Sequence, residues 1–103
     1  VPAGPSADPA PARLALSAPR PSPARGPAEV SLALPAPARV RWEVLDAAGR
    51  RMDGGDLGER AAGTVRWTIA PRAADGRVLP AGLYFVRVTA GGATATTRWA
   101  VTR

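Results

Sequence analysis

The sequence predicts an all-β fold, a sandwich or small barrel of about six to seven strands. Apolar and polar residues alternate in several short segments, which is the pattern of strands that bury one face. Turn signals rich in glycine, proline and aspartate separate these segments at roughly regular spacing, and no stretch has a convincing helical period. The three tryptophans fall in three different predicted strands, where large side chains can fill a core.

The chain has 103 residues, which is enough for one domain with a modest core. Ten of its twelve prolines fall at or before Pro37, and the first residues, VPAGPSADPAPA, are of low complexity. Proline at this density blocks sheet ladders and favours an extended polyproline II conformation. We therefore predict an extended Pro/Ala-rich arm over residues 1–27, with one short strand in RLALSA (13–18), and a sandwich over residues 28–103.

The predicted strands of the sandwich are marked by their apolar patterns. Period-two alternation or a continuous apolar run marks segments 29–34, 39–44, 65–69, 83–89 and 93–102. The glycine-rich segment 50–57 is predicted to be irregular, with room for one short edge strand. The side chains expected to fill the core are Leu32, Val40, Trp42, Val44, Val65, Trp67, Tyr84, Val86, Val88 and Trp99.

Asp46-Ala47-Ala48-Gly49 predicts a turn between two of these strands. In such a turn the Asp46 carboxylate can accept hydrogen bonds from backbone N–H groups two or three residues further on, and Gly49 can take a positive φ angle. This structural role is favoured over a functional one for Asp46. Gly91-Gly92 predicts a second tight hairpin turn.

Two motifs resemble a known family. The run LALPAPARVRWEVLDAAGRRM is similar to the opening of flagellar hook-capping Ig-like domains, and equally to the C-terminal sorting domains of bacterial type IX secretion. Leu34-Pro35, the alternation over 40–44 and the turn Asp46 to Arg50 carry this match. A second match is Gly82-Leu83-Tyr84-Phe85, which looks like the family's Gly-x-Tyr-Phe strand and is followed by a Gly-Gly turn and a last strand. The resemblance covers roughly residues 19–103.

The resemblance implies an immunoglobulin-like β-sandwich that is not catalytic. Carried over residue by residue, the family motifs fall on Asp46, Gly49, Arg50, Gly82 and Tyr84, and the terminal basic residue falls on Arg103. The family often has Trp-Asp-Gly-Arg-Asp after its middle strand, whereas this chain continues from Trp67 as TIAPRAADG. An ion or partner bound by that acidic loop in relatives is therefore not carried over.

The composition removes most routes to catalysis. The chain has no cysteine and no histidine, so it lacks thiolate chemistry, the commonest general base and the commonest metal ligand. Asp53-Gly54-Gly55-Asp56 has the closely spaced carboxylates of a calcium loop, but the EF-hand spacing is absent and Arg50, Arg51 and Arg60 oppose a cation. We predict no catalytic residue, no cofactor and no metal site, and hence no enzyme.

Charge and hydropathy constrain partners and location. The net charge is +6, and all the basic residues are arginines spread along the chain, so specific nucleic-acid binding is not expected and polyanion binding is the weaker alternative. No apolar stretch reaches the length of a transmembrane helix. The sequence begins at Val1 without an initiator methionine, which we interpret as a mature secreted product or an excised domain. The expected location is outside the cell or on its surface.

Two function classes follow. In the first, the domain is a subunit of an extracellular assembly, possibly a filament, whose N-terminal arm runs along a neighbouring copy; Arg13, Leu14 and Leu16 would form the donated strand. In that class, an arm that closes its own sandwich as an intramolecular first strand is the alternative. In the second class, the domain is a C-terminal sorting or anchoring unit of a larger secreted protein. The partners are accordingly a second copy of the chain, or secretion and cell-surface machinery.

Overall fold

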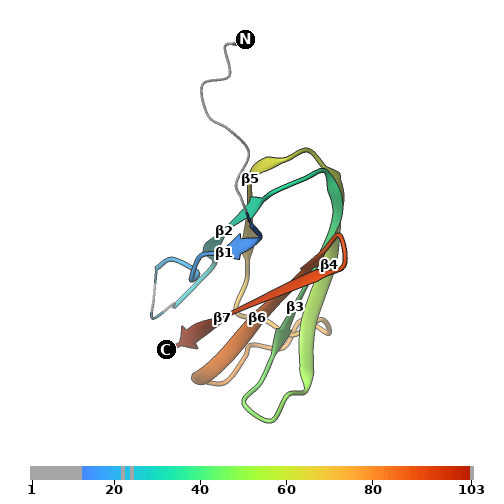
Figure 1. Cartoon of the computed structure of the whole chain (residues 1–103). Helices are drawn as coiled ribbons and strands as arrows, with labels where there is room; N and C mark the ends of the chain where they lie inside the picture. Colours follow the sequence, from blue (N-terminus) through green and yellow to red (C-terminus); the bar gives the residue numbers. More distant parts are fainter. Residues whose placement is uncertain (1–12, 22, 24, 103) are drawn as a thin grey trace, which may run out of the picture.

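The computed structural model describes residues 13–21, 23 and 25–102, which form two antiparallel sheets packed face to face (Figure 1). The three-stranded sheet contains β1 (Ala15–Leu16), β2 (Ala28–Leu34) and β5 (Gly63–Ile69). The four-stranded sheet contains β4 (Arg51–Arg60), β3 (Ala38–Leu45), β6 (Gly82–Ala90) and β7 (Ala93–Val101). The predicted all-β sandwich of six to seven strands is confirmed.

The strand order is that of an immunoglobulin-like sandwich. The sheets run β1-β2-β5 and β4-β3-β6-β7, so the chain crosses between layers after β2, after β4 and after β5. In constant-type immunoglobulin domains the fourth strand joins the first sheet. Here β4 stays beside β3, to which a tight turn connects it, and the second sheet gains the extra strand.

The core lies between the sheets and follows the predicted alternation. Buried apolar side chains project inward from β2, β3, β5, β6 and β7, and the larger ones are Val30, Leu32, Leu34, Val40, Val44, Val65, Ile69, Tyr84, Val86, Val88, Trp99 and Val101. Trp99 is fully buried, and its ring lies 6.4 Å from that of Tyr84 at an interplanar angle of 57°. Tilted aromatic pairs of this kind add to the stabilisation that burial provides.

Two of the predicted core residues, Trp42 and Trp67, are only half-buried. Trp67 lies on β5, an edge strand, so one side of its ring has no neighbouring strand. Trp42 lies on β3, but its indole leans across Gly55 of the edge strand β4; a Cβ at Gly55 would lie 2.8 Å from Trp42 Nε1. The alternation correctly assigns both rings to the inner face, but their burial is limited by the nearby sheet edges.

Strand β4 is longer and more regular than the sequence predicts. Its ten residues pair with β3 through two register shifts, which leave Met52 and Leu57 as the extra residues of two bulges. Bulges increase local twist and interrupt the period-two pattern, which is why the segment looks irregular in sequence. Gly54 and Gly55 allow the close approach of neighbouring atoms rather than ending the strand.

The described part of the predicted arm packs on its own sandwich. Ala15 and Leu16 of β1 pair with Ala33 and Leu32 of β2. The pairing is extended by Ser17, whose backbone N–H donates to the Ser31 carbonyl oxygen at 2.9 Å. Residues 1–12, 22 and 24 of the predicted arm lie outside the described residues. Within the described ranges, no helix is long and apolar enough to cross a membrane.

Candidate assembly site

The turn between β3 and β4 is fixed by the Asp46 carboxylate. Its Oδ1 accepts hydrogen bonds from the backbone N–H groups of Ala48 (2.9 Å) and Arg50 (2.8 Å), and its Oδ2 accepts one from Arg50 Nε at 2.7 Å. Gly49 has a φ of 88°, a value that favours glycine. The Arg50 backbone N–H is the main cause that lowers the pKa of Asp46, and the Arg50 guanidinium adds to it. The geometry therefore gives Asp46 a structural role.

Tyr84 connects β6 to the loop that precedes it. Its ring is buried, and its hydroxyl donates a 2.6 Å hydrogen bond to the carbonyl oxygen of Pro80, four residues upstream. Immunoglobulin-like sandwiches use a comparable tyrosine corner to fix the crossover into this strand. Gly82 lies between these two residues and pairs with Val101. A Cβ at Gly82 would meet no atom within 4 Å, so packing does not require glycine there.

The motif residues of the two matches meet in space. Asp46, Arg50, Gly82 and Tyr84 line one shallow hollow at the end of the sandwich where β3 ends and β6 begins. Gly49 belongs to the same turn. Leu83, at the rim of this hollow, is 44% exposed. The structure thus brings together residues more than thirty positions apart, although it gives most of them roles in the turn and the loop.

The predicted assembly residues lie elsewhere. Leu14 and Leu16 are half-buried and pack against the core, whereas Arg13 is exposed. Leu14 lines a second, apolar hollow with Pro35 and Ala90, at the opposite ends of β3 and β6 from the Asp46 turn. In the single chain, therefore, the two leucines do not leave their sandwich; Leu16 belongs to an intramolecular first strand, and Leu14 precedes that strand by one residue. Donation of this strand to a neighbour stays a proposal.

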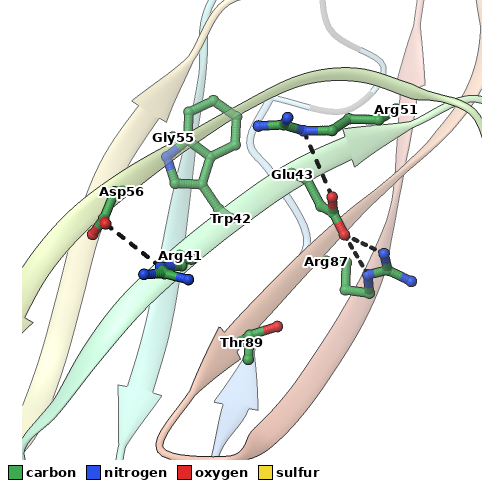
Figure 2. Close-up of a pocket in the computed structure, with 8 residues that line it drawn as sticks. All are labelled: Arg41, Trp42, Glu43, Arg51, Gly55, Asp56, Arg87 and Thr89. Carbon is green, nitrogen blue, oxygen red and sulfur yellow. Dashed lines mark hydrogen bonds and ion pairs between the residues drawn. The ribbon is translucent and has the colours of Figure 1, made fainter.

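The outer face of the four-stranded sheet carries ion pairs that the sequence does not reveal (Figure 2). Glu43 lies between Arg87, whose Nε donates to it at 2.7 Å, and Arg51 at 3.7 Å. Asp56 is paired with Arg39 at 2.9 Å and with Arg41 at 3.5 Å. The hydrogen bond from the Arg39 side chain is the main cause that lowers the pKa of Asp56. These pairs depend on the β3–β4 and β3–β6 registers, which alternation alone does not specify.

The arrangement offers little chemistry beyond binding. Glu43 and Asp56 each form ion pairs with two arginines. The pKa of Asp56 is lowered, so its carboxylate stays charged and is poorly suited to proton transfer. Asp53 pairs with Val44 and Asp56 with Arg41, three ladder positions apart, so the two carboxylates point to opposite faces of β4. Over the described residues, no group of three acidic, histidine or cysteine side chains could hold a metal ion.

These observations define an immunoglobulin-like sandwich whose polar side chains fix turns and form surface ion pairs. The chain belongs to the FlgD Ig-like domain family, whose sequence profile matches residues 20–94. The resemblance to hook-capping domains predicted from Asp46 to Arg50 and from Gly82 to Phe85 is thereby confirmed. Among curated proteins, none matches the sequence significantly.

Solved structures with the same fold come from two bacteria. FlgD from P. aeruginosa is 27% identical, with a TM-score of 0.57 over 70% of this chain and 57% of its own. Dimeric latent PorU from Porphyromonas gingivalis is 16% identical, with a TM-score of 0.65 over 85% of this chain and 9% of its own. PorZ, a surface component of the type-IX secretion system of the same organism, is 24% identical, with a TM-score of 0.53 over 87% of this chain and 11% of its own. The chain thus spans less than two thirds of each relative.

Proposed function

We propose that this domain is a non-catalytic assembly module of a secreted or cell-surface bacterial protein, joined to neighbouring copies by exchange of β1. Membership of the FlgD Ig-like domain family supports a structural role. The observation that carries the exchange is the shortness of β1: its two residues, Ala15 and Leu16, pair with β2, and both Leu16 and the preceding Leu14 are only half-buried. Release of the strand would break these two ladder pairs and the hydrogen bonds between Ser17 and Ser31, while the bridge between Arg20 and Glu29 could hold the following segment in place.

Exchange would replace each lost contact with an identical one. Leu16 of one copy would pair with Leu32 of the next, and Ser17 would donate to Ser31 of the next, as they do within one chain. The prolines that follow β1 favour an extended chain and so reduce the entropy lost when the strand docks. Because each copy gives its strand to one neighbour and receives one from another, repetition builds a filament unless the rotation closes a ring.

A pair of cysteines tests the exchange directly, since the chain contains none. Ala15 lies opposite Ala33 in the β1–β2 ladder, within the range that a disulfide spans. Ala15→Cys combined with Ala33→Cys should form links between chains when the concentrated protein is oxidised, giving a ladder of multimers on a non-reducing gel. Ala15→Cys with Ala100→Cys is the matched control, because Ala100 pairs with Leu83 on a different sheet.

A disulfide that forms only within one chain would contradict the exchange. If Ala15→Cys with Ala33→Cys forms only a disulfide within one chain at every concentration, β1 stays in its own sandwich and the exchange does not occur. Deletion of residues 1–17 supplies a second measurement. A folded monomer supports donation, whereas unfolding of the truncated chain, with a full-length chain that is itself monomeric, assigns the strand to its own domain.

A sorting function is the second candidate, favoured by the shared fold with PorU and PorZ. Both proteins are much longer than this chain, which spans 9% of PorU and 11% of PorZ. A reporter protein carrying this domain at its C-terminus should then reach the surface of a bacterium that has type IX secretion. Tyr84→Ala should reduce surface display in that assay more than Leu83→Ala, and equal display with and without the domain would rule the function out.

A further inference from the structure

The two free edges of the four-stranded sheet are built differently. Strand β4 carries two bulges and the charged residues Asp53, Asp56, Glu59 and Arg60, which are the usual means of preventing edge-to-edge pairing. Strand β7 has no bulge and far fewer charges. Its nine residues pair one for one with β6 without a register shift, and they include no proline and a single charged residue, Arg98. Within the described part of the chain, no strand pairs with its other edge.

We propose that the free edge of β7 binds a second copy of the chain. The two β7 strands would pair antiparallel about a two-fold axis through Thr97, and the two four-stranded sheets would become one continuous sheet. Addition of a strand to an exposed edge satisfies backbone N–H and C=O groups that otherwise face water. An isologous contact of this kind is self-complementary, so one surface serves both copies.

The register follows from the strand itself. Thr97 is the central residue of Ala93–Val101, so an axis at Thr97 pairs all nine residues of each copy. On the inner face this register sets Trp99 opposite Ala95 of the second copy, a large side chain against a small one. On the outer face it sets Arg98 opposite Thr96. An axis moved one residue, to Arg98, would shorten the ladder and set two arginines directly opposite each other, which is destabilising.

The inner face beside this edge is incompletely covered in a single chain. The opposite layer has three strands where this one has four, and β1 lies across from β7. Ala95 and Thr97 are half-buried and Ala93 is exposed, although all three point toward the inner side of the sheet. Leu14 and Leu16 are half-buried on the facing layer. Two-fold pairing of β7 would bring these half-covered surfaces of both copies together and remove apolar area from water.

This contact deepens the proposed assembly function and rests on it, because self-association is the use assigned to the domain. It does not need the exchange of β1, since it leaves β1 in place. Combined with that exchange, it would connect filaments in pairs. The two contacts form different strand ladders, β1 with β2 and β7 with β7, so each can be tested by substitutions in its own ladder.

Thr97→Cys in the full-length chain tests the register. The two substituted positions would face each other across the axis, so mild oxidation should give a disulfide-linked dimer, in roughly tenfold higher yield than Thr94→Cys. Thr94 is the matched control because it is exposed on the same strand but lies opposite Ala100 of the second copy. Equal yields from the two variants would overturn the proposal.

Charge substitution gives an independent readout. Thr96→Lys sets a positive charge opposite Arg98 twice per dimer and should weaken association by up to about tenfold, whereas Thr94→Lys should not. Adding Arg98→Glu to Thr96→Lys should restore it. Because Thr96 also faces Arg87 within its own sheet, unfolding is measured separately on dilute protein. Unchanged association of Thr96→Lys would overturn the two-fold contact, while links through Ala15→Cys and Ala33→Cys would still support the exchange.

Discussion

The Tyr84 hydroxyl donates a 2.6 Å hydrogen bond to the Pro80 carbonyl oxygen, and the Tyr84 ring meets that of the fully buried Trp99. One side chain thus joins the long loop over residues 70–81 to the core of the sandwich. The same residue belongs to the Gly-x-Tyr motif that carries part of the family resemblance. Its place in the fold accounts for the motif without any catalytic role.

Tyr84→Phe should lower the free energy of unfolding by about 0.5–1.5 kcal/mol, because it removes one hydrogen bond and keeps the ring. Urea unfolding followed by tryptophan fluorescence measures the change. Tyr84→Leu, which also loses the contact with Trp99, should cost more. Equal stability of Tyr84→Phe and the unmodified chain would show that the hydrogen bond contributes nothing.

The Asp46 turn should make stability depend on pH at the acid end. Hydrogen bonds, first of all from the Arg50 backbone N–H, lower the pKa of Asp46 in the folded state. Its contribution is therefore complete above the unfolded value near pH 4 and is lost as the pH falls through the lower folded value. Asp46→Asn keeps an acceptor for Ala48 and Arg50 but loses the charge. The stability difference between the unmodified chain and Asp46→Asn, measured by urea unfolding, should shrink from pH 6 to pH 2; a constant difference would contradict the assignment.

Gly55→Ala should destabilise the domain, whereas Gly82→Ala should not. A Cβ at Gly55 would lie 2.8 Å from Trp42 Nε1 and force the indole away from β4, at a cost of about 1–3 kcal/mol. Gly82 has open space around it, so the same change should stay within about 0.5 kcal/mol. Thermal unfolding of both variants checks the contrast. Equal effects would mean that Trp42 does not rest on Gly55.

Polyanion binding should be weak and sensitive to salt. Four arginines of the outer sheet face already pair with Glu43 or Asp56, which leaves fewer free arginines on that face of the described chain to contact a polyanion. Fluorescence anisotropy with duplex DNA should show binding that disappears near physiological salt. Glu43→Gln with Asp56→Asn should strengthen it by freeing the arginines. A sequence-specific complex that survives physiological salt would contradict this expectation.

The sequence predicts the face that a side chain occupies better than the place of its strand in the sheet. Alternation correctly identifies the inner faces of β2, β3 and β5, because one face of each strand is buried. It does not say which strand forms an edge, and so it overestimates the burial of Trp42 and Trp67. The bulges at Met52 and Leu57 hide β4 from any period-two pattern.

The candidate site was predictable to a similar degree. The Asp46 turn is recognisable because its hydrogen bonds are local and its spacing is fixed by the turn. The pairs of Glu43 with Arg51 and Arg87 are not, since they join strands whose register depends on tertiary structure. The sequence is least able to predict which copy of the sandwich Leu14 and Leu16 pack on, because the same short strand fits its own sandwich or an identical neighbour.

Sedimentation equilibrium of the full-length chain over a range of concentrations, at physiological salt, tests the assembly function most directly. The account predicts a weight-average mass that rises above that of one chain as concentration increases, with polymers in negative-stain micrographs of the same samples. A mass equal to one chain at every concentration, and micrographs without polymers, would contradict it.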